Sequence, residues 1–213
     1  MRKGRAEMSH TAASVKRMTL TQAVEVLHAA RTGEVVVTTM GSAREWQKLG
    51  TNRLDLIYVA SSMGQGTSIG LGIALAQPRR QVVVCSGDGS MLMNLGSLVT
   101  ISAQAPANLI VIVFDNGVYE VTGAQPTAAA PLLRSDSSRV DFIALARASG
   151  FTRVFAFDAA NAWKTAVVEV LRGAGPTFVS LHVEPVVDGG LPAFAGPAPD
   201  RARALQVALT RGE

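Results

Sequence analysis

Two kinds of hydrophobic pattern alternate along the chain. Short runs are apolar at nearly every position, and Gly, Pro, Asn or Asp residues follow them. Between them, apolar residues recur at the spacing of one helix face. Strands without polar–apolar alternation are typical of a parallel sheet that helices cover on both faces. The pattern therefore predicts a doubly wound α/β domain with a parallel sheet. The predicted strands span residues 34–38, 54–59, 81–85, 109–114, 153–156 and 178–182.

The segments between these runs predict the helices. Thr19 or Thr21 can cap a first helix, whose apolar stripe ends near Ala30. A short helix is expected after Gly41-Ser42, and a terminal helix from Asp200. Further helices are predicted over 67–76, about 90–104, 140–148 and 160–171. The pattern divides the chain into a flexible N-terminal extension (1–17), a main domain (18–185) and a C-terminal arm (186–213).

Composition narrows the class of protein. The formal charge of +4 comes largely from basic residues near the two ends, without the aromatic clustering of a nucleic-acid binder. Cys85 is the one cysteine and lies in a valine run, which indicates a buried side chain and excludes an internal disulfide. Pro106 divides the uncharged stretch 89–114 into helix and strand, so no membrane span is predicted. The N-terminus has no apolar signal region, and we expect a cytoplasmic location.

Two predicted strands end in oxygen-bearing side chains. Asp88 follows one of them in the turn Gly87-Asp88-Gly89-Ser90, and Asn116 follows another. The carboxyl ends of parallel strands meet at one edge of a sheet, so these oxygens can lie side by side. A carboxylate with a carboxamide oxygen suits Mg²⁺. Gly89 and Ser90 open a predicted helix, whose free N–H groups attract an anion. These residues predict a divalent metal bound together with a diphosphate.

A second glycine motif allows a different interpretation. The segment 64–70 (Gly-Gln-Gly-Thr-Ser-Ile-Gly) follows a strand, opens a helix and has Asp88 at the end of the next strand, as in a dinucleotide-binding oxidoreductase. Its final spacing is one residue too long, its strand is not the first of the fold, and Asp88 lies within its own glycine turn. The metal–diphosphate interpretation is therefore favoured.

The motifs resemble those of thiamine diphosphate-dependent decarboxylases. The stretches Ser61 to Gly64, Gly87 to Ser97, Asp115 to Glu120 and Gly123 to Thr127 are similar to sulfopyruvate and phosphonopyruvate decarboxylases. The similarity runs from about Met18 to about Pro185 and covers only the diphosphate-binding half of such enzymes. It implies the thiamine diphosphate-binding fold, with thiamine diphosphate and Mg²⁺ as cofactors.

The resemblance also implies roles for individual residues. The backbone carbonyl of Val118 would join Asp88 and Asn116 as a metal ligand, and Met63 would hold the cofactor in a bent shape. Tyr119 and Thr122 would face the site from a long, mobile loop between residues 117 and about 138. No catalytic residue is identified within the chain. The implied cofactor-binding residues are Gly41, Ser42, Ser61, Ser62, Met63, Gly64, Gly87, Asp88, Gly89, Ser90, Asn116, Val118, Tyr119 and Thr122.

Most members of that family use a glutamate from a pyrimidine-binding domain, which the sequence does not contain. The resemblance therefore implies the β-type subunit of a 2-oxo acid decarboxylase, a carboxy-lyase that forms a hetero-oligomer with a pyrimidine-domain (α-type) subunit. A non-catalytic thiamine diphosphate-binding module remains an alternative. A 2-oxoacid:ferredoxin oxidoreductase β chain would need cluster cysteines.

The substrate is expected to be a small 2-oxo acid, with no further identity readable from the sequence. Arg44 and Arg134 are candidates for binding a sulfonate or phosphonate group. The histidines, His10, His28 and His182, lie away from the motifs in sequence, and we expect them to be structural or exposed.

Overall fold

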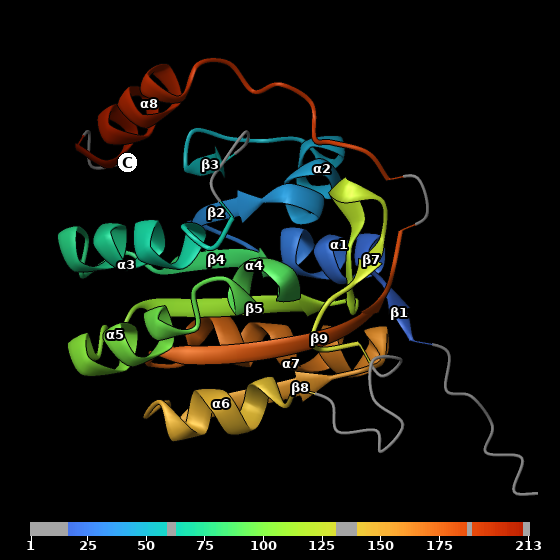
Figure 1. Ribbon diagram of the computed structural model, residues 1–213. Coiled ribbons are helices and arrows are strands. Elements are labelled where there is room, and N and C mark those ends of the chain that lie inside the picture. Colours follow the sequence, from blue (N-terminus) through green and yellow to red (C-terminus); the bar gives the residue numbers. More distant parts are fainter. Residues whose placement is uncertain (1–16, 59–62, 131–139, 187–188, 211–213) are drawn as a thin grey trace, which may run out of the picture.

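The computed structural model describes residues 17–58, 63–130, 140–186 and 189–210, and it confirms the predicted α/β fold (Figure 1). The main sheet is parallel, in the order β1-β9-β5-β4-β2-β3, and β8 also pairs with β9. Its strands are β1 (Met18–Thr19), β2 (Val35–Thr39), β3 (Asp55–Tyr58), β4 (Val82–Gly87), β5 (Leu109–Asp115), β8 (Arg153–Phe157) and β9 (Thr177–Glu184). The strand β1 was not predicted, because two residues are too short to form a hydrophobic pattern.

Helices cover both faces of the sheet, as Figure 1 shows. The helices are α1 (Leu20–Ala30), α2 (Met40–Leu49), α3 (Gly66–Ala76), α4 (Asp88–Leu92), α5 (Gly96–Gln104), α6 (Phe142–Ala148), α7 (Ala160–Arg172) and α8 (Ala198–Thr210). The core on one face joins α1, α2 and α7, and the core on the other joins α3, α4, α5, α6 and α8. Val83 and Cys85 pack into the first core, Val82 and Val84 into the second. Two apolar faces explain why the strands show no alternation.

Local signals set several element boundaries as predicted. The Thr19 side chain and Gln22 form a reciprocal capping box at the start of α1.

Cys85 is fully buried, and burial raises the pKa of its thiol. Helix α3 packs so closely against β4 that an added Cβ at Gly70 would stand 2.1 Å from the Cγ2 of Val84.

The structure corrects two predicted segments. The helix predicted over about 90–104 is two helices, because the chain turns between Leu92 and Gly96. In that turn the Asn94 side chain donates to the Gly64 carbonyl oxygen at 2.9 Å, a tertiary contact that interrupts the helix. The expected loop after Gly117 begins as an ordered hairpin. It comprises β6 (Val118–Tyr119), the 3₁₀-helix η1 (Glu120–Thr122) and β7 (Gln125–Pro126). The end of that loop, residues 131–139, lies outside the described residues.

The order of the strands positions a ligand site. Strand β2 lies between β3 and β4, so the chain changes direction along the sheet after β3. In open α/β sheets, ligands bind beyond the carboxyl ends of strands at such a switch point. In this sheet the switch point lies between β2 and β4, so a ligand site is expected beyond the carboxyl ends of β2, β4 and the adjacent β5.

The segments outside the main domain are only partly described. Residues 1–16 of the predicted extension lie outside the described residues. The C-terminal arm runs along α2, where Gln47 Nε2 donates to the Ala193 carbonyl oxygen at 3.1 Å, and Leu205 of α8 is buried. The three-part division of the chain remains a prediction. Within the described residues, none of the helices has the length and apolar character needed to cross a membrane.

Candidate functional site

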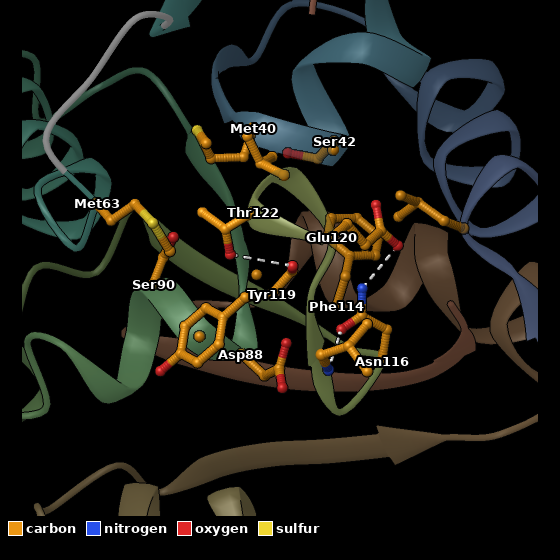
Figure 2. A pocket seen from close by; sticks show the side chains of 16 residues that line it. Met40, Ser42, Met63, Asp88, Ser90, Phe114, Asn116, Tyr119, Glu120 and Thr122 are labelled. Carbon is orange, nitrogen blue, oxygen red and sulfur yellow. Dashed lines mark hydrogen bonds between the residues drawn. The ribbon is translucent and has the colours of Figure 1, made fainter. Parts of the chain in front are cut away.

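A cleft opens at the carboxyl ends of β2, β4 and β5 (Figure 2). Together with the open solvent at its mouth, the space not filled by protein atoms is about 530 Å³. Eleven of the fourteen predicted cofactor residues line it, from four separate segments of the chain. They are Gly41, Ser42, Met63, Gly87, Asp88, Gly89, Ser90, Asn116, Val118, Tyr119 and Thr122. The fold thus brings together turns that are far apart in sequence.

Asp88 is a buried carboxylate in this cleft. The residue is 1% exposed, and its Oδ2 accepts a hydrogen bond from Thr127 Oγ1 at 2.8 Å. Burial raises the pKa of Asp88 to about 6, and the nearby Asp115 carboxylate adds to this rise. Bonds from Thr127 and from the backbone at Gly89 and Gly117 oppose it only in part. Among the described residues, the groups that shift this pKa include no cation.

This environment fits a metal ion. A buried carboxylate without a cationic partner is costly, and a divalent cation would remove that cost. No three His, Cys, Asp or Glu residues gather into a ligand group in the described part of the chain. A metal here would therefore depend on Asp88 together with amide and carbonyl oxygens, the donor set that Mg²⁺ prefers. The residues present fit the predicted cation.

Asn116 and Asp88 both line the cleft and are labelled in Figure 2. Its Oδ1 accepts from the Val118 backbone N–H at 2.9 Å, and its Nδ2 donates to Glu120 Oε1 at 2.7 Å. The backbone around Val118 is shaped by Gly117, whose φ of +75° favours glycine. The predicted metal ligands, Asp88, Asn116 and Val118, all line the same cleft.

The turn after β4 lies directly under an aromatic ring. An added Cβ at Gly89 would stand 2.4 Å from the Cε1 of Tyr119, so only glycine allows this approach. The helix that follows, α4, has five residues, shorter than predicted. An anion here would therefore rely on individual N–H groups near Gly89 and Ser90 more than on a long helix dipole.

One predicted residue that the structure describes does not line the cleft. It is Gly64, whose carbonyl oxygen accepts from Asn94 Nδ2 at 2.9 Å and whose φ is +87°. Ser61 and Ser62 lie outside the described residues. Ser42 does line the cleft, but its hydroxyl is used within the fold, donating to the carbonyl oxygens of Thr39 at 2.7 Å and Cys85 at 3.1 Å. Its backbone is the part left for a ligand.

The cleft also contains residues that were not predicted. These are Leu20, Met40, Phe114, Glu120 and Val121. Met40 has a φ of +47°, an unusual value for a non-glycine residue, at the junction of β2 and α2. Glu120 lies within the stretch that carries the family resemblance, and two of its side-chain partners, Arg44 and Val186, are distant in sequence.

Two predictions about other polar residues change with the structure. Arg44 is 7% exposed and does not line the cleft, because its guanidinium is bonded to Glu45, Glu120 and the Gly190 carbonyl oxygen. Arg134 lies outside the described residues. His182 is nearer the site than its sequence position suggested, with Nε2 3.5 Å from Asp115 Oδ2, although it does not line the cleft.

Comparison with known proteins identifies a family for this arrangement. The sequence model described as "Thiamine pyrophosphate enzyme, C-terminal TPP binding domain" matches residues 32–181. That range contains every predicted cofactor residue, and among the described residues that line the cleft it leaves out Leu20 alone.

Curated relatives match over most of the chain. A phosphonopyruvate decarboxylase of Streptomyces viridochromogenes is 43% identical over 155 residues, which cover 73% of this chain and 36% of the relative. A sulfopyruvate decarboxylase subunit beta of Methanothermobacter thermautotrophicus is 44% identical over 128 residues, which cover 60% of this chain and 62% of that subunit. The matched region is therefore about a third of the first relative and less than two thirds of the second.

Solved structures share the fold. A thiamine diphosphate-dependent 4-hydroxybenzoylformate decarboxylase of Rhodococcus jostii RHA1 superposes with a TM-score of 0.64 at 19% identity. The superposition covers 88% of this chain and 36% of the other. At this identity, the likeness supports the architecture alone.

Proposed function

Because the chain belongs to the thiamine pyrophosphate enzymes, through their C-terminal TPP binding domain, we propose that it binds thiamine diphosphate with Mg²⁺ and acts as the β-type subunit of a 2-oxo acid decarboxylase. The observation that carries this proposal is the cleft at the switch point, which ten other predicted residues line together with the buried Asp88 carboxylate. A carboxylate in that environment stabilises a bound cation, and the cation in turn binds the cofactor's diphosphate.

Each side of the cleft has a separate role in this proposal. Asp88, Asn116 and the Val118 carbonyl oxygen hold Mg²⁺. The turns at Gly87–Ser90 and Gly41–Ser42 face the diphosphate, where backbone N–H groups suit its oxygens. Met63, the Tyr119 ring and Thr122 border the middle of the cofactor, and Met63 keeps it bent.

When bound, thiamine diphosphate supplies a carbanion that attacks the carbonyl of a 2-oxo acid and stores the electrons released with CO₂. The chain's own residues orient the diphosphate end and neutralise its charge. Of the two carboxyl groups that line the described cleft, Asp88 is assigned to the metal, and Glu120 is bonded to Asn116, Val186 and Arg44. Neither is free to activate the cofactor's pyrimidine ring, so that function falls to a partner.

The partner in this proposal is a pyrimidine-domain, α-type subunit. The designation "subunit beta" of the sulfopyruvate decarboxylase relative supports a two-chain enzyme. We place the complex in the cytoplasm, in keeping with the single, unpaired and buried Cys85. The substrate is a 2-oxo acid with an anionic group, as in sulfopyruvate or phosphonopyruvate. Since Arg44 is fully engaged, the cation that recognises this group comes from the partner or from the segment containing Arg134.

Calorimetry and product analysis test the proposal in two steps. Thiamine diphosphate should bind the full chain in the presence of Mg²⁺, and EDTA should abolish the binding. Adding the α-type subunit should then give CO₂ release from a sulfonated or phosphonated 2-oxo acid. Binding without decarboxylation in the assembled complex would favour the non-catalytic module. Lack of Mg²⁺-dependent binding would refute the assignment of the site.

A further inference from the structure

Glu120 lies at the centre of a buried hydrogen-bond network beside the proposed metal position (Figure 2). Its side chain is 6% exposed. Oε1 accepts from Asn116 Nδ2 at 2.7 Å and from the Val186 backbone N–H at 2.9 Å. Oε2 accepts from Arg44 Nη2 at 3.3 Å. The carboxylate is thus occupied on both oxygens by donors from three different segments.

The surrounding structure fixes the position of this carboxylate. Arg44 donates through Nε to Glu45 Oε1 at 2.8 Å and through Nη1 to the Gly190 carbonyl oxygen at 3.1 Å, so the guanidinium cannot turn freely. An added Cβ at Gly41 would stand 3.2 Å from Glu120 Oε2, which places the carboxylate directly against the backbone at that turn. A charged group this constrained can orient its neighbours.

The neighbour that depends on orientation is the Asn116 amide. An amide can rotate by half a turn and exchange its oxygen with its NH₂ group, which would present two donors to a cation. A carboxylate only accepts, so Glu120 bonds to Nδ2 and not to Oδ1. On the other side, the Val118 N–H donates to Oδ1 and leaves its second lone pair available. Both contacts select the same orientation.

We propose that Glu120 is a positioning residue, paired with Arg44, that holds the Asn116 amide with Oδ1 turned toward the metal. This inference rests on the proposed function and adds a residue whose role lies outside the direct ligands. Because Glu120 also accepts from Val186, the same carboxylate joins the metal site to the start of the C-terminal arm.

The test measures Mn²⁺ affinity of the full chain in the presence of thiamine diphosphate, from the paramagnetic resonance signal of free Mn²⁺. In Glu120→Gln the side-chain amide must point its NH₂ group at a donor, either Arg44 or the pair Asn116 and Val186. The first arrangement breaks the contact with Arg44, and the second removes the acceptor of Asn116 Nδ2, so Asn116 is held less firmly in its orientation. Removing an outer partner of a metal ligand weakens metal binding by about 10-fold or more, and we expect a loss of that size.

Repeating the measurement in an Asn116→Asp variant distinguishes a role of Glu120 in orienting the Asn116 amide from a role in stabilising the fold. Asn116→Asp replaces the amide with a carboxylate, which offers oxygen on both sides and needs no orienting partner. In that background Glu120 repels the introduced carboxylate, so adding Glu120→Gln should leave Mn²⁺ affinity unchanged or raise it. A purely structural role would lower affinity equally in both backgrounds. Glu45→Gln is the matched control, because it removes another carboxylate bonded to Arg44 without contacting Asn116.

The outcomes distinguish the two proposals. If the wild-type chain binds Mn²⁺ with thiamine diphosphate and Glu120→Gln binds equally well, the positioning role is refuted and the proposed function stands. An equal loss in both Asn116 backgrounds, or in Glu45→Gln, would also refute the positioning role. If the wild-type chain does not bind, both proposals fail. Thermal unfolding of each variant, measured without metal, confirms that the compared chains are folded.

Discussion

Replacing Asp88 with asparagine should stabilise the metal-free chain at neutral pH and also remove its metal binding. The pKa of Asp88 is raised from 3.8 to about 6, chiefly by burial. A folded-state pKa above the unfolded value means that the folded chain holds the proton more tightly. Ionising Asp88 therefore costs stability as the pH rises through about 4 to 6, and the full cost is present above that window. The asparagine side chain carries no charge at any of these pH values and avoids this cost.

The magnitude follows from the pKa difference. A rise of about two pH units at 1.36 kcal/mol each corresponds to about 3 kcal/mol at neutral pH. Asparagine can still accept from Thr127, but its NH₂ group must find a new acceptor or water in the cleft, which offsets part of the gain. That offset does not depend on pH. The change in relative stability between pH 4 and pH 7.5 should therefore be about 2–3 kcal/mol, equivalent to about 4–12 °C in melting temperature for a domain of this size.

The assay is thermal unfolding of both chains in EDTA across that pH range. The difference between the two melting temperatures at each pH removes the contribution of groups that titrate equally in both chains. Adding Mg²⁺ and thiamine diphosphate at pH 7.5 should then stabilise only the wild type, by about 2.7 kcal/mol at a ligand concentration 100 times the dissociation constant. A melting-temperature difference that stays flat between pH 4 and pH 7.5 would refute the reasoning about Asp88.

Three further predictions concern packing and catalysis. Gly70→Ala should destabilise the chain by about 1–3 kcal/mol, since its Cβ would meet Val84 at 2.1 Å. Gly72→Ala on the same helix has nothing within 4 Å of the new Cβ and should stabilise the chain by about 0.5–1 kcal/mol. Chemical denaturation measures both variants, and a Gly70→Ala chain more stable than the Gly72→Ala chain would contradict both predictions. Gly89→Ala should displace the Tyr119 ring and weaken thiamine diphosphate binding in calorimetry with little effect on melting temperature, whereas unchanged affinity would show that this contact is dispensable. The isolated chain should release no CO₂ from 2-oxo acids until the α-type subunit is added, and steady turnover by the chain alone would exclude the need for a partner.

The meeting of Asp88 and Asn116 at one edge of the sheet could be predicted from sequence because its signal is local. Asp88 and Asn116 each follow an apolar strand, and one general rule about parallel sheets brings two such strand ends to the same edge. The fold agrees, since β4 and β5 are hydrogen-bonded neighbours with Gly87 paired to Phe114. Cys85 was likewise placed correctly in the core by its valine neighbours.

Other features depended on contacts between distant residues. The predicted helix over 90–104 breaks because Asn94 bonds to Gly64, which no helical periodicity reports. Arg44 was considered for substrate binding because it is a cation near a motif. The structure instead pairs it with Glu45 and Glu120, and Glu120 lies far along the chain. His182 approaches Asp115 because β9 and β5 are adjacent strands.

The layers of the fold, the approximate positions of most strands and helices, and the turns that line the cleft could all be derived from the sequence. Hydrophobic pattern reports whether a residue is buried and with what period, and these properties follow from each segment alone. The three-dimensional arrangement was needed to show which strands are neighbours, how Glu120 joins Asn116 to Arg44, and why the Asp88 carboxylate has a raised pKa. Those outcomes depend on the identity of a residue's partners in space, and side-chain charge and hydrogen bonding act over a few ångströms irrespective of distance along the chain.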